Sequence, residues 1–388
     1  MPWDILFYLM VFIHDKPQLS SYMRTCRTLY EYGVPFLANE CRVDVANCVP
    51  SFYNFMLRDP TRPTLISHLE LVARGSRPGA YSYLLEIPLF KDILAATTSL
   101  TSLTLTTAVV HEFLPLSPYS EALLQSISSF KALQELKLVA VNRLAKNVLS
   151  RVQAPLRKII LEYATVDIRL RDLLRMDLDF LDPLFLLQGF QDSLQEVEIY
   201  DHPNPGCVGI KETQLPHIHA FTYTSETLAH VHLDCVSHAL PNVQKVILSA
   251  TQAFSPPLRD LRTIRKEHQE GAIGNAVWTS VDELSCNTPW LYTMAWSCPV
   301  RFWHGTYVNG RTLPCFQDAI DGIRPEHLDI VVQINTFKKV EDLSSLFVAE
   351  IPVTHLNVDL EGMRDNSVCF GTSVTTWFPQ LFVSSYLM

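Results

Sequence analysis

The side chains best suited to chemistry are histidines in the middle of the chain. Two spaced pairs are followed by a cysteine and one more histidine: His217 and His219, His230 and His232, Cys235 and His238. Imidazole nitrogens and thiolates are ordinary zinc ligands, and side chains at i and i+2 of a strand share one face. His230 and His232 also flank Val231, where a half-buried strand carries polar residues. We therefore favour a solvated strand face over a zinc site.

Carboxylates offer a second kind of chemistry. Glu196 and Glu198 could act as a general acid and a general base, but no other reactive side chains gather near them. The sequence lacks the spaced motifs of common enzymes: Gly-x-x-x-x-Gly-Lys-Ser/Thr, Gly-x-Gly-x-x-Gly, Gly-x-Ser-x-Gly and His-Glu-x-x-His. We expect no catalytic residues and no cofactor. The alternative, an enzyme on an unrecognised α/β fold, predicts titratable groups that converge in one pocket.

Composition narrows the class of partner. The chain has 388 residues, of which 48% are hydrophobic, so it can bury a large core and is not a disordered tether. Lys and Arg number 31 against 40 Asp and Glu, and the net charge is −9. Nucleic-acid-binding proteins need a basic surface to replace phosphate counterions. We expect a protein partner and no nucleic acid.

Cysteine spacing and hydropathy bear on the compartment. The nine cysteines include no Cys-x-x-Cys pair, and an odd number does not favour a disulfide framework. No run reaches the roughly 18 uncharged apolar residues that span a bilayer. The apolar N-terminal stretch carries Asp4 and has no positive n-region, unlike a signal peptide. We expect a cytoplasmic or nuclear protein that does not contact a membrane.

A short phrase, apolar-x-x-apolar-x-apolar, recurs along most of the chain and favours leucine. Its copies occupy residues 66-69-71, 100-103-105, 133-136-138, 156-159-161, 194-197-199, 218-221-223, 228-231-233, 243-246-248, 281-284-286, 353-356-358 and 378-381-383. A plain strand-like run also lies at residues 330-332-334. The last two apolar positions of each copy point to one face of a short strand. Segments with helical spacing follow several copies, for example Leu144-Val148-Val152. Because one strand and one helix cannot bury their own apolar faces, stacked copies predict an α/β solenoid. The alternative is an ordinary α/β domain with unrelated strands.

These copies resemble leucine-rich repeats in an irregular form. The resemblance covers residues 64–388 and implies short parallel strands on a concave face and helices on a convex face. The outward strand positions of the concave face are then the candidate substrate-binding residues: Glu196, Glu198, Tyr200, His230, His232 and Asp234. This acidic and aromatic set suits a protein partner with basic residues, and the alternative is a strand face that only contacts solvent. We expect Trp290, Trp296 and Trp303 in the core.

The first forty-five residues have a different pattern, which predicts three short helices. Pro2 and Asp4 favour a helix start, and apolar residues follow at helical spacing from Ile5. We expect a second helix over residues 19–23 and a third that ends near residues 33–35. So much apolar surface on three short helices predicts a docking unit with a poor core of its own.

This block resembles an F-box. Residues 1–6, Met-Pro-Trp-Asp-Ile-Leu, match the family's opening Leu-Pro-x-Glu-Ile-Leu, and Leu19 through Cys26-Arg27 match its middle motif. The resemblance implies docking on a Skp-type adaptor, which links the chain to a cullin-based ubiquitin ligase and hence to protein degradation. It assigns the adaptor contacts to Pro2, Ile5, Leu6, Leu9, Leu19 and Cys26. The alternative is a helical cap that closes the solenoid.

The sequence thus predicts an α/β protein in three parts. Residues 1–45 form an F-box-like helical block, residues 46–63 a linker or first-repeat helix, and residues 64–388 an irregular leucine-rich-repeat domain. The predicted function is that of a non-catalytic substrate receptor that holds an unknown protein substrate. The rival function is a leucine-rich-repeat scaffold with no link to a ligase.

Overall fold

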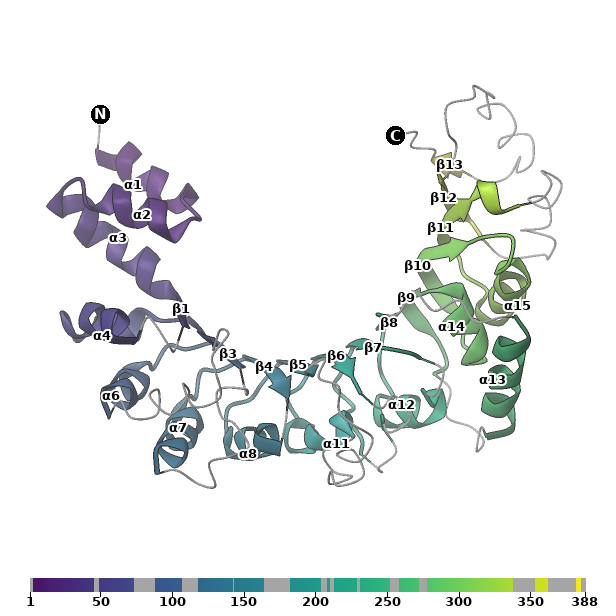
Figure 1. Ribbon diagram of the computed structural model, residues 1–388, viewed down its shortest axis with the longest axis horizontal. Coiled ribbons are helices and arrows are strands. Elements are labelled where there is room, and N and C mark those ends of the chain that lie inside the picture. Colours follow the sequence, from purple (N-terminus) through teal and green to yellow (C-terminus); the bar gives the residue numbers. More distant parts are fainter. Residues whose placement is uncertain are drawn as a thin grey trace. The chain divides into compact units, whose positions relative to one another are not determined.

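The chain folds into two compact units, Met1–Ala164 and Thr165–Met388 (Figure 1). The computed structural model describes residues 3–44, 49–72, 88–106, 118–141, 143–163, 182–203, 208–209, 213–228, 231–251, 258–271, 278–337, 353–361 and 382–384. Among the described helices, none is both long enough and apolar enough to cross a membrane.

The first unit begins with three helices, which we call the helical block: α1 (Trp3–Phe12), α2 (Lys16–Met23) and α3 (Arg27–Asn39). The Asp15 carboxylate caps α2 by accepting a hydrogen bond from the Gln18 amide at 3.2 Å. The third helix continues past its predicted end near Pro35. A proline removes one helical hydrogen bond, but Val34 and Ala38 are buried on either side of it, and this packing holds the last turn.

The block has a buried core, formed by Met10, Leu19, Met23, Leu29 and Val34. Partly buried side chains pack against it, and two of these, Phe55 and Leu65, come from the segment that follows the block. The expectation of a poor core therefore holds only in part. The helices bury one set of apolar residues among themselves and complete it with the start of the repeats.

Gly33 sets how closely the three helices approach each other. A Cβ atom at this position would lie 2.8 Å from Met10 Cε and closer still to the side chain of Met23. We expect Gly33→Val to lower the free energy of unfolding of the first unit by about 1–3 kcal/mol, the usual cost of overpacking. Chemical denaturation measures the change. Gly189→Val is the control, because a Cβ there meets nothing within 4 Å, and an equal loss in both variants would contradict the packing role of Gly33.

The rest of the first unit alternates short strands and helices. Its elements are β1 (Glu40–Asp44), α4 (Val49–Leu57), η1 (Arg62–Leu65), β2 (His68–Val72), α6 (Pro88–Ala96), β3 (Ser102–Thr106), α7 (Pro118–Ser129), β4 (Glu135–Val141), α8 (Arg143–Arg151) and β5 (Lys158–Tyr163). Each strand pairs in parallel with the next along the chain, and the helices lie on one side of the strands (Figure 1). This is the architecture of a leucine-rich-repeat-like solenoid.

The recurring phrase places its apolar residues in register across these strands. Leu69, Leu103, Leu136 and Ile159 are aligned partners, and all four are buried. The carbonyl before each strand also binds the next repeat: the Ser67 oxygen accepts hydrogen bonds from the Thr101 and Ser102 amides at 2.8 and 3.0 Å. The opposite strand face carries half-exposed side chains, and we call it the open face.

The second unit repeats this arrangement. Its elements are α11 (Pro183–Leu186), η3 (Gln188–Phe190), β6 (Glu196–His202), β7 (Ala220–Ser225), α12 (Leu233–Ala239), β8 (Lys245–Ala250), α13 (Leu258–Gly271), β9 (Val281–Cys286), α14 (Thr288–Thr293), β10 (Val300–Val308), α15 (Leu313–Ile323), β11 (His327–Gln333), η5 (Ile334–Thr336), β12 (His355–Glu361) and β13 (Phe382–Ser384). Strands β6 to β13 pair in parallel in chain order.

One row of aligned apolar residues runs through all the strands of the second unit. Pairing aligns Val197, Phe221, Val246, Leu284, Trp303, Leu328, Leu356 and Val383 in turn. Trp290, Trp296 and Trp303 are buried, which confirms their expected place in the core.

Nine of the eleven phrase copies fall on strands, and one does not. Of the last copy only Val383 is described, and it lies on β13; residues 378 and 381 lie outside the described residues. The copy at residues 228-231-233 follows β7 too closely to form a strand, because a parallel strand needs a return segment first. Val231 and His232 lead into helix α12 instead, and Leu233 is the first residue of that helix. The prediction of a strand at this copy was wrong. The strands β1 and β10, by contrast, were not predicted.

Candidate functional site

Helix α1 exposes apolar side chains to solvent. We call this surface the apolar docking face, and it consists of Trp3, Ile5, Tyr8, Leu9, Val11 and Phe12, which are 42–64% exposed. Tyr32 and Phe36 of α3 are exposed as well. The described part of the chain exposes large apolar side chains at only two other positions, Leu57 and Tyr307. An apolar patch rimmed by polar residues marks an interaction site more often than chance exposure does.

The composition of α1 explains this surface. Met10 is buried and Leu6 and Ile13 are partly buried against the core of the block, so they form the inner stripe of the helix. The ring of Phe7 stacks on Tyr32 with centroids 3.8 Å apart. Asp4 is the one charged residue of α1, so the helix is apolar on its outer side as well. A helix that is apolar all round is ordinarily buried on all sides, which favours a partner on this face.

The structure places the six predicted adaptor contacts in different surroundings. Ile5 and Leu9 lie on the apolar docking face, whereas Leu6 is half-buried against the core of the block. Leu19 is 1% exposed and belongs to that core, so its side chain is not at the surface. Cys26 is the N-cap of α3, and its sulfur accepts a hydrogen bond from the Leu29 amide at 3.5 Å. Pro2 lies outside the described residues.

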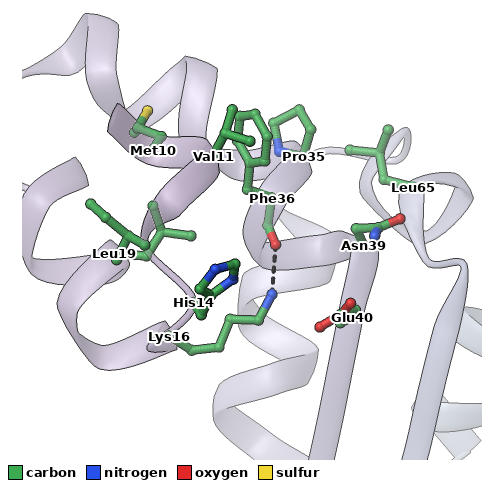
Figure 2. A pocket seen from close by; sticks show the side chains of 11 residues that line it. Met10, Val11, His14, Lys16, Leu19, Pro35, Phe36, Asn39, Glu40 and Leu65 are labelled. Carbon is green, nitrogen blue, oxygen red and sulfur yellow. Dashed lines mark hydrogen bonds between the residues drawn. The ribbon is translucent and has the colours of Figure 1, made fainter. Parts of the chain in front are cut away.

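A pocket of about 440 Å³ lies between the ends of α1, α2 and α3 (Figure 2). Its walls are both polar and apolar and include Val11 and Phe36, which are also exposed at the surface. The Lys16 ammonium donates a hydrogen bond to the Phe36 carbonyl at 2.7 Å, drawn as a dashed line in Figure 2. This lysine therefore caps the C-terminal turn of α3, where a positive charge is favourable.

The open face carries many ion pairs between neighbouring strands. Lys137 and Glu162 are 2.9 Å apart, and Lys245 and Glu283 are 2.7 Å apart. Both pairs are about one-third to one-half exposed, so they contribute little to stability. In each pair the lysine neutralises the charge of the glutamate, so these parts of the open face carry little net charge.

The predicted substrate-binding residues do not form one group. Glu196, Glu198 and Tyr200 lie on the open face of β6, where the Tyr200 hydroxyl donates to Glu198 Oε2 at 2.8 Å. His232 is the N-cap of α12 and Asp234 lies in the first turn of that helix. The placement of these two on the strand face was wrong, because the chain enters helix α12 at His232. His230 lies outside the described residues.

A second group of side chains, which the sequence did not point to, lies on the open face of β10, β11 and β12. Phe302, His327 and His355 are aligned partners, and we call them the ring column. Neighbouring rings stack with centroids 4.3 and 4.2 Å apart. Beside the column, His304 Nδ1 lies 2.8 Å from Asp329 Oδ2. The sequence alone does not reveal this group, because its rings are about 25 residues apart along the chain. Only the pairing register of the three strands brings them together.

Burial makes three of the described cysteines poor nucleophiles. Burial raises the pKa of Cys41 to about 12 and the pKa of Cys298 and Cys315 to about 11, and a reactive thiol needs a lowered pKa. The described residues also contain no cluster of three or more His, Cys, Asp or Glu side chains able to hold a metal ion.

No protein-family model matches the chain, and no curated protein matches it. Among solved structures, the crystal structure of the TLR13-ssRNA13 complex resembles 83% of this chain, with 12% sequence identity and a TM-score of 0.33. The match covers 49% of that protein's chain, so this chain spans about half its length. The fold described above rests on the strand pairing and register of the chain itself.

Proposed function

We propose that this chain is a non-catalytic substrate receptor of a Skp-cullin-F-box ubiquitin ligase. In this proposal the helical block docks on a Skp-type adaptor, and the open face of the repeats holds a protein substrate. The chain breaks no bond. It raises the local concentration of the substrate near a conjugating enzyme, and this proximity accelerates the transfer of ubiquitin.

The apolar docking face is the observation that carries the proposal. It lies on the helix whose sequence resembles the opening of an F-box, and Ile5 and Leu9 of that resemblance are exposed on it. Apolar side chains of a helix are the usual anchors when the helix packs into a groove of its partner. The parallel strands that follow offer an extended surface of the kind that solenoids use for binding proteins.

The second candidate is a repeat scaffold that binds a protein and recruits no ligase. The observation that favours it is the contact of Phe55 and Leu65 with the core of the block. That contact suits a helical cap of the solenoid as well as a docking unit. The two functions differ in whether the apolar docking face binds an adaptor.

Co-expression of the full chain with a Skp-type adaptor from the same source tests the proposal. We expect the wild-type chain to co-purify with the adaptor and the variant Ile5→Asp/Leu9→Asp to bind about 100-fold more weakly, because each anchor of an interface contributes about 1.4–2 kcal/mol. Circular dichroism checks that both chains are folded.

The matched control is Leu57→Asp/Tyr307→Asp. These two side chains are 52% and 46% exposed, close to the 48% and 42% of Ile5 and Leu9, but they lie outside α1. The control variant should bind the adaptor as the wild type does. If the folded wild-type chain does not bind an adaptor, the ligase proposal fails and the scaffold function stands. Equal binding by the α1 variant and the wild type would also contradict it.

A further inference from the structure

The ring column on β10–β12 presents titratable side chains in an unusual arrangement. Phe302 and His327 stack at 4.3 Å, and His327 and His355 stack at 4.2 Å with their planes 12° apart. At this separation two imidazolium charges would repel each other. Burial and the neighbouring His355 and Arg301 lower the pKa of His327, which favours its neutral form.

The charged side chains on the strands that carry these rings are mostly acidic. The face of β10–β12, with Glu326 just before β11, carries one base and four acids: Arg301, Glu326, Asp329, Asp359 and Glu361. Arg301 lies 3.6 Å from Glu326 and over the ring of Phe302. On β9, Glu283 is paired with Lys245 and Asp282 is exposed. The described residues of β13, Phe382–Ser384, carry no charge.

The charge of this face depends on its histidines. With neutral imidazoles, one base and four acids give a net charge of −3. Protonation of His304, His327 and His355 adds three positive charges and brings the net charge to zero. Histidine is the side chain that changes charge between pH 5 and 8. The face therefore attracts cations at neutral pH and loses that attraction in mild acid.

We propose that the open face of β10–β12 is a docking surface for a basic segment of a protein partner, and that protonation of its histidines releases the partner. The proposal deepens the proposed function by naming the class of substrate segment that the repeats hold. Charge complementarity identifies this occupant. The carboxylates of Asp329 and Asp359 accept hydrogen bonds from guanidinium and ammonium groups.

Binding and protonation compete, because the two are thermodynamically linked. A bound cation disfavours further positive charge on the imidazoles, and an imidazolium disfavours the bound cation. Affinity is therefore highest above the range in which histidines titrate and falls as the pH falls through it. Raised salt weakens binding at every pH by screening.

Fluorescence anisotropy with a fluorescein-labelled octa-arginine peptide tests the proposal on the full-length chain. We expect binding at pH 7.5 that weakens about tenfold at pH 5.5, since the attraction between complementary charges is removed. The variant His327→Phe/His355→Phe keeps stacked rings that do not titrate, and it should lose most of this pH dependence. The variant His327→Lys/His355→Lys imitates the protonated state and should bind weakly at pH 7.5, so the test does not depend on stability in acid.

Two double variants with the same net charge test whether the peptide binds this face or is attracted to the acidic chain as a whole. Asp359→Asn/Glu361→Gln removes two charges from the face, and Glu135→Gln/Glu267→Gln removes two from β4 and α13. The first pair should weaken binding about tenfold more than the second. Equal affinities of the two pairs, or wild-type binding that does not change between pH 7.5 and 5.5, would overturn the proposal. Neither result depends on the adaptor, so the docking of α1 is judged separately.

Discussion

Replacing Trp303 with alanine is expected to lower the free energy of unfolding of the second unit by about 3–5 kcal/mol. The indole is fully buried in the middle of the row of aligned apolar residues in the second unit. It stacks on Phe316 of α15 with centroids 5.6 Å apart, so it joins β10 to the helix that follows. Its Nε1–H donates to the Cys286 carbonyl on β9 at 3.1 Å. Alanine leaves a large cavity and removes the donor to that carbonyl.

Urea denaturation measures this loss, and hydrogen exchange locates it. Because each repeat contacts chiefly its neighbours, we expect faster exchange in β9, β10 and β11 and little change in β6. Trp3→Ala is the control, since that indole is 50% exposed on α1. A loss of stability in the Trp303 variant no greater than in the Trp3 variant would contradict the assignment of Trp303 to the core.

The two proposed surfaces should respond to these variants in opposite ways. Trp303 supports the strand that carries Phe302 and His304, so its loss should weaken octa-arginine binding and leave adaptor binding unchanged. Trp3 belongs to the apolar docking face, so its replacement should weaken adaptor binding alone. Such a separation is the behaviour of a receptor with one surface for the ligase and another for the substrate.

The strands could be predicted because their apolar residues repeat in a fixed order. Leu69 and Leu71 recur as Leu103 and Leu105 at the aligned positions of the next strand, and the same holds for most copies. A parallel sheet in chain order needs little more than this phrase and a return segment. The helical returns are less regular, so their ends did not follow from the sequence.

In the two unpredicted strands, β1 and β10, other residues replace leucine at the positions of the recurring phrase. At β1 the spacing of the recurring phrase is met by Ala38, Cys41 and Val43. Because alanine and cysteine are less apolar than leucine, a search for leucine does not find this copy. In β10 the phrase breaks at Gly305, where the register shifts between Trp303 and Thr306. The positive φ of Gly305, 67°, accommodates this bulge. A period-two search therefore cannot find the second half of β10.

The candidate sites followed from the sequence less well than the strands did. Apolar periodicity identified α1, but only packing decides that Leu6 faces the core and Leu9 faces solvent. The ring column depends on the register of three strands whose rings come from separate repeats. Sequence reasoning instead favoured His232, because it assumed a strand where α12 begins.

The other large effect is expected at Asp182, a carboxylate that is 2% exposed at the start of α11. Its Oδ1 accepts hydrogen bonds from the amides of Leu184 at 3.1 Å and Phe185 at 3.4 Å, which caps the helix. The same oxygen accepts from the Gly209 amide at 3.0 Å, so it also holds a loop 27 residues away. We expect Asp182→Ala to lower the free energy of unfolding of the second unit by about 3 kcal/mol, because buried amides lose a charged acceptor.

Asp15→Ala is the matched control for this prediction. Asp15 caps α2 in the same way, but its bond to the Gln18 amide is exposed, and water can replace it. Its removal should cost about 0.5–1 kcal/mol. Asp182→Asn keeps an acceptor oxygen and should lose less than the alanine variant. If both aspartates cost the same on replacement by alanine, the loop contact through Gly209 adds nothing, and the cap alone explains the burial of Asp182.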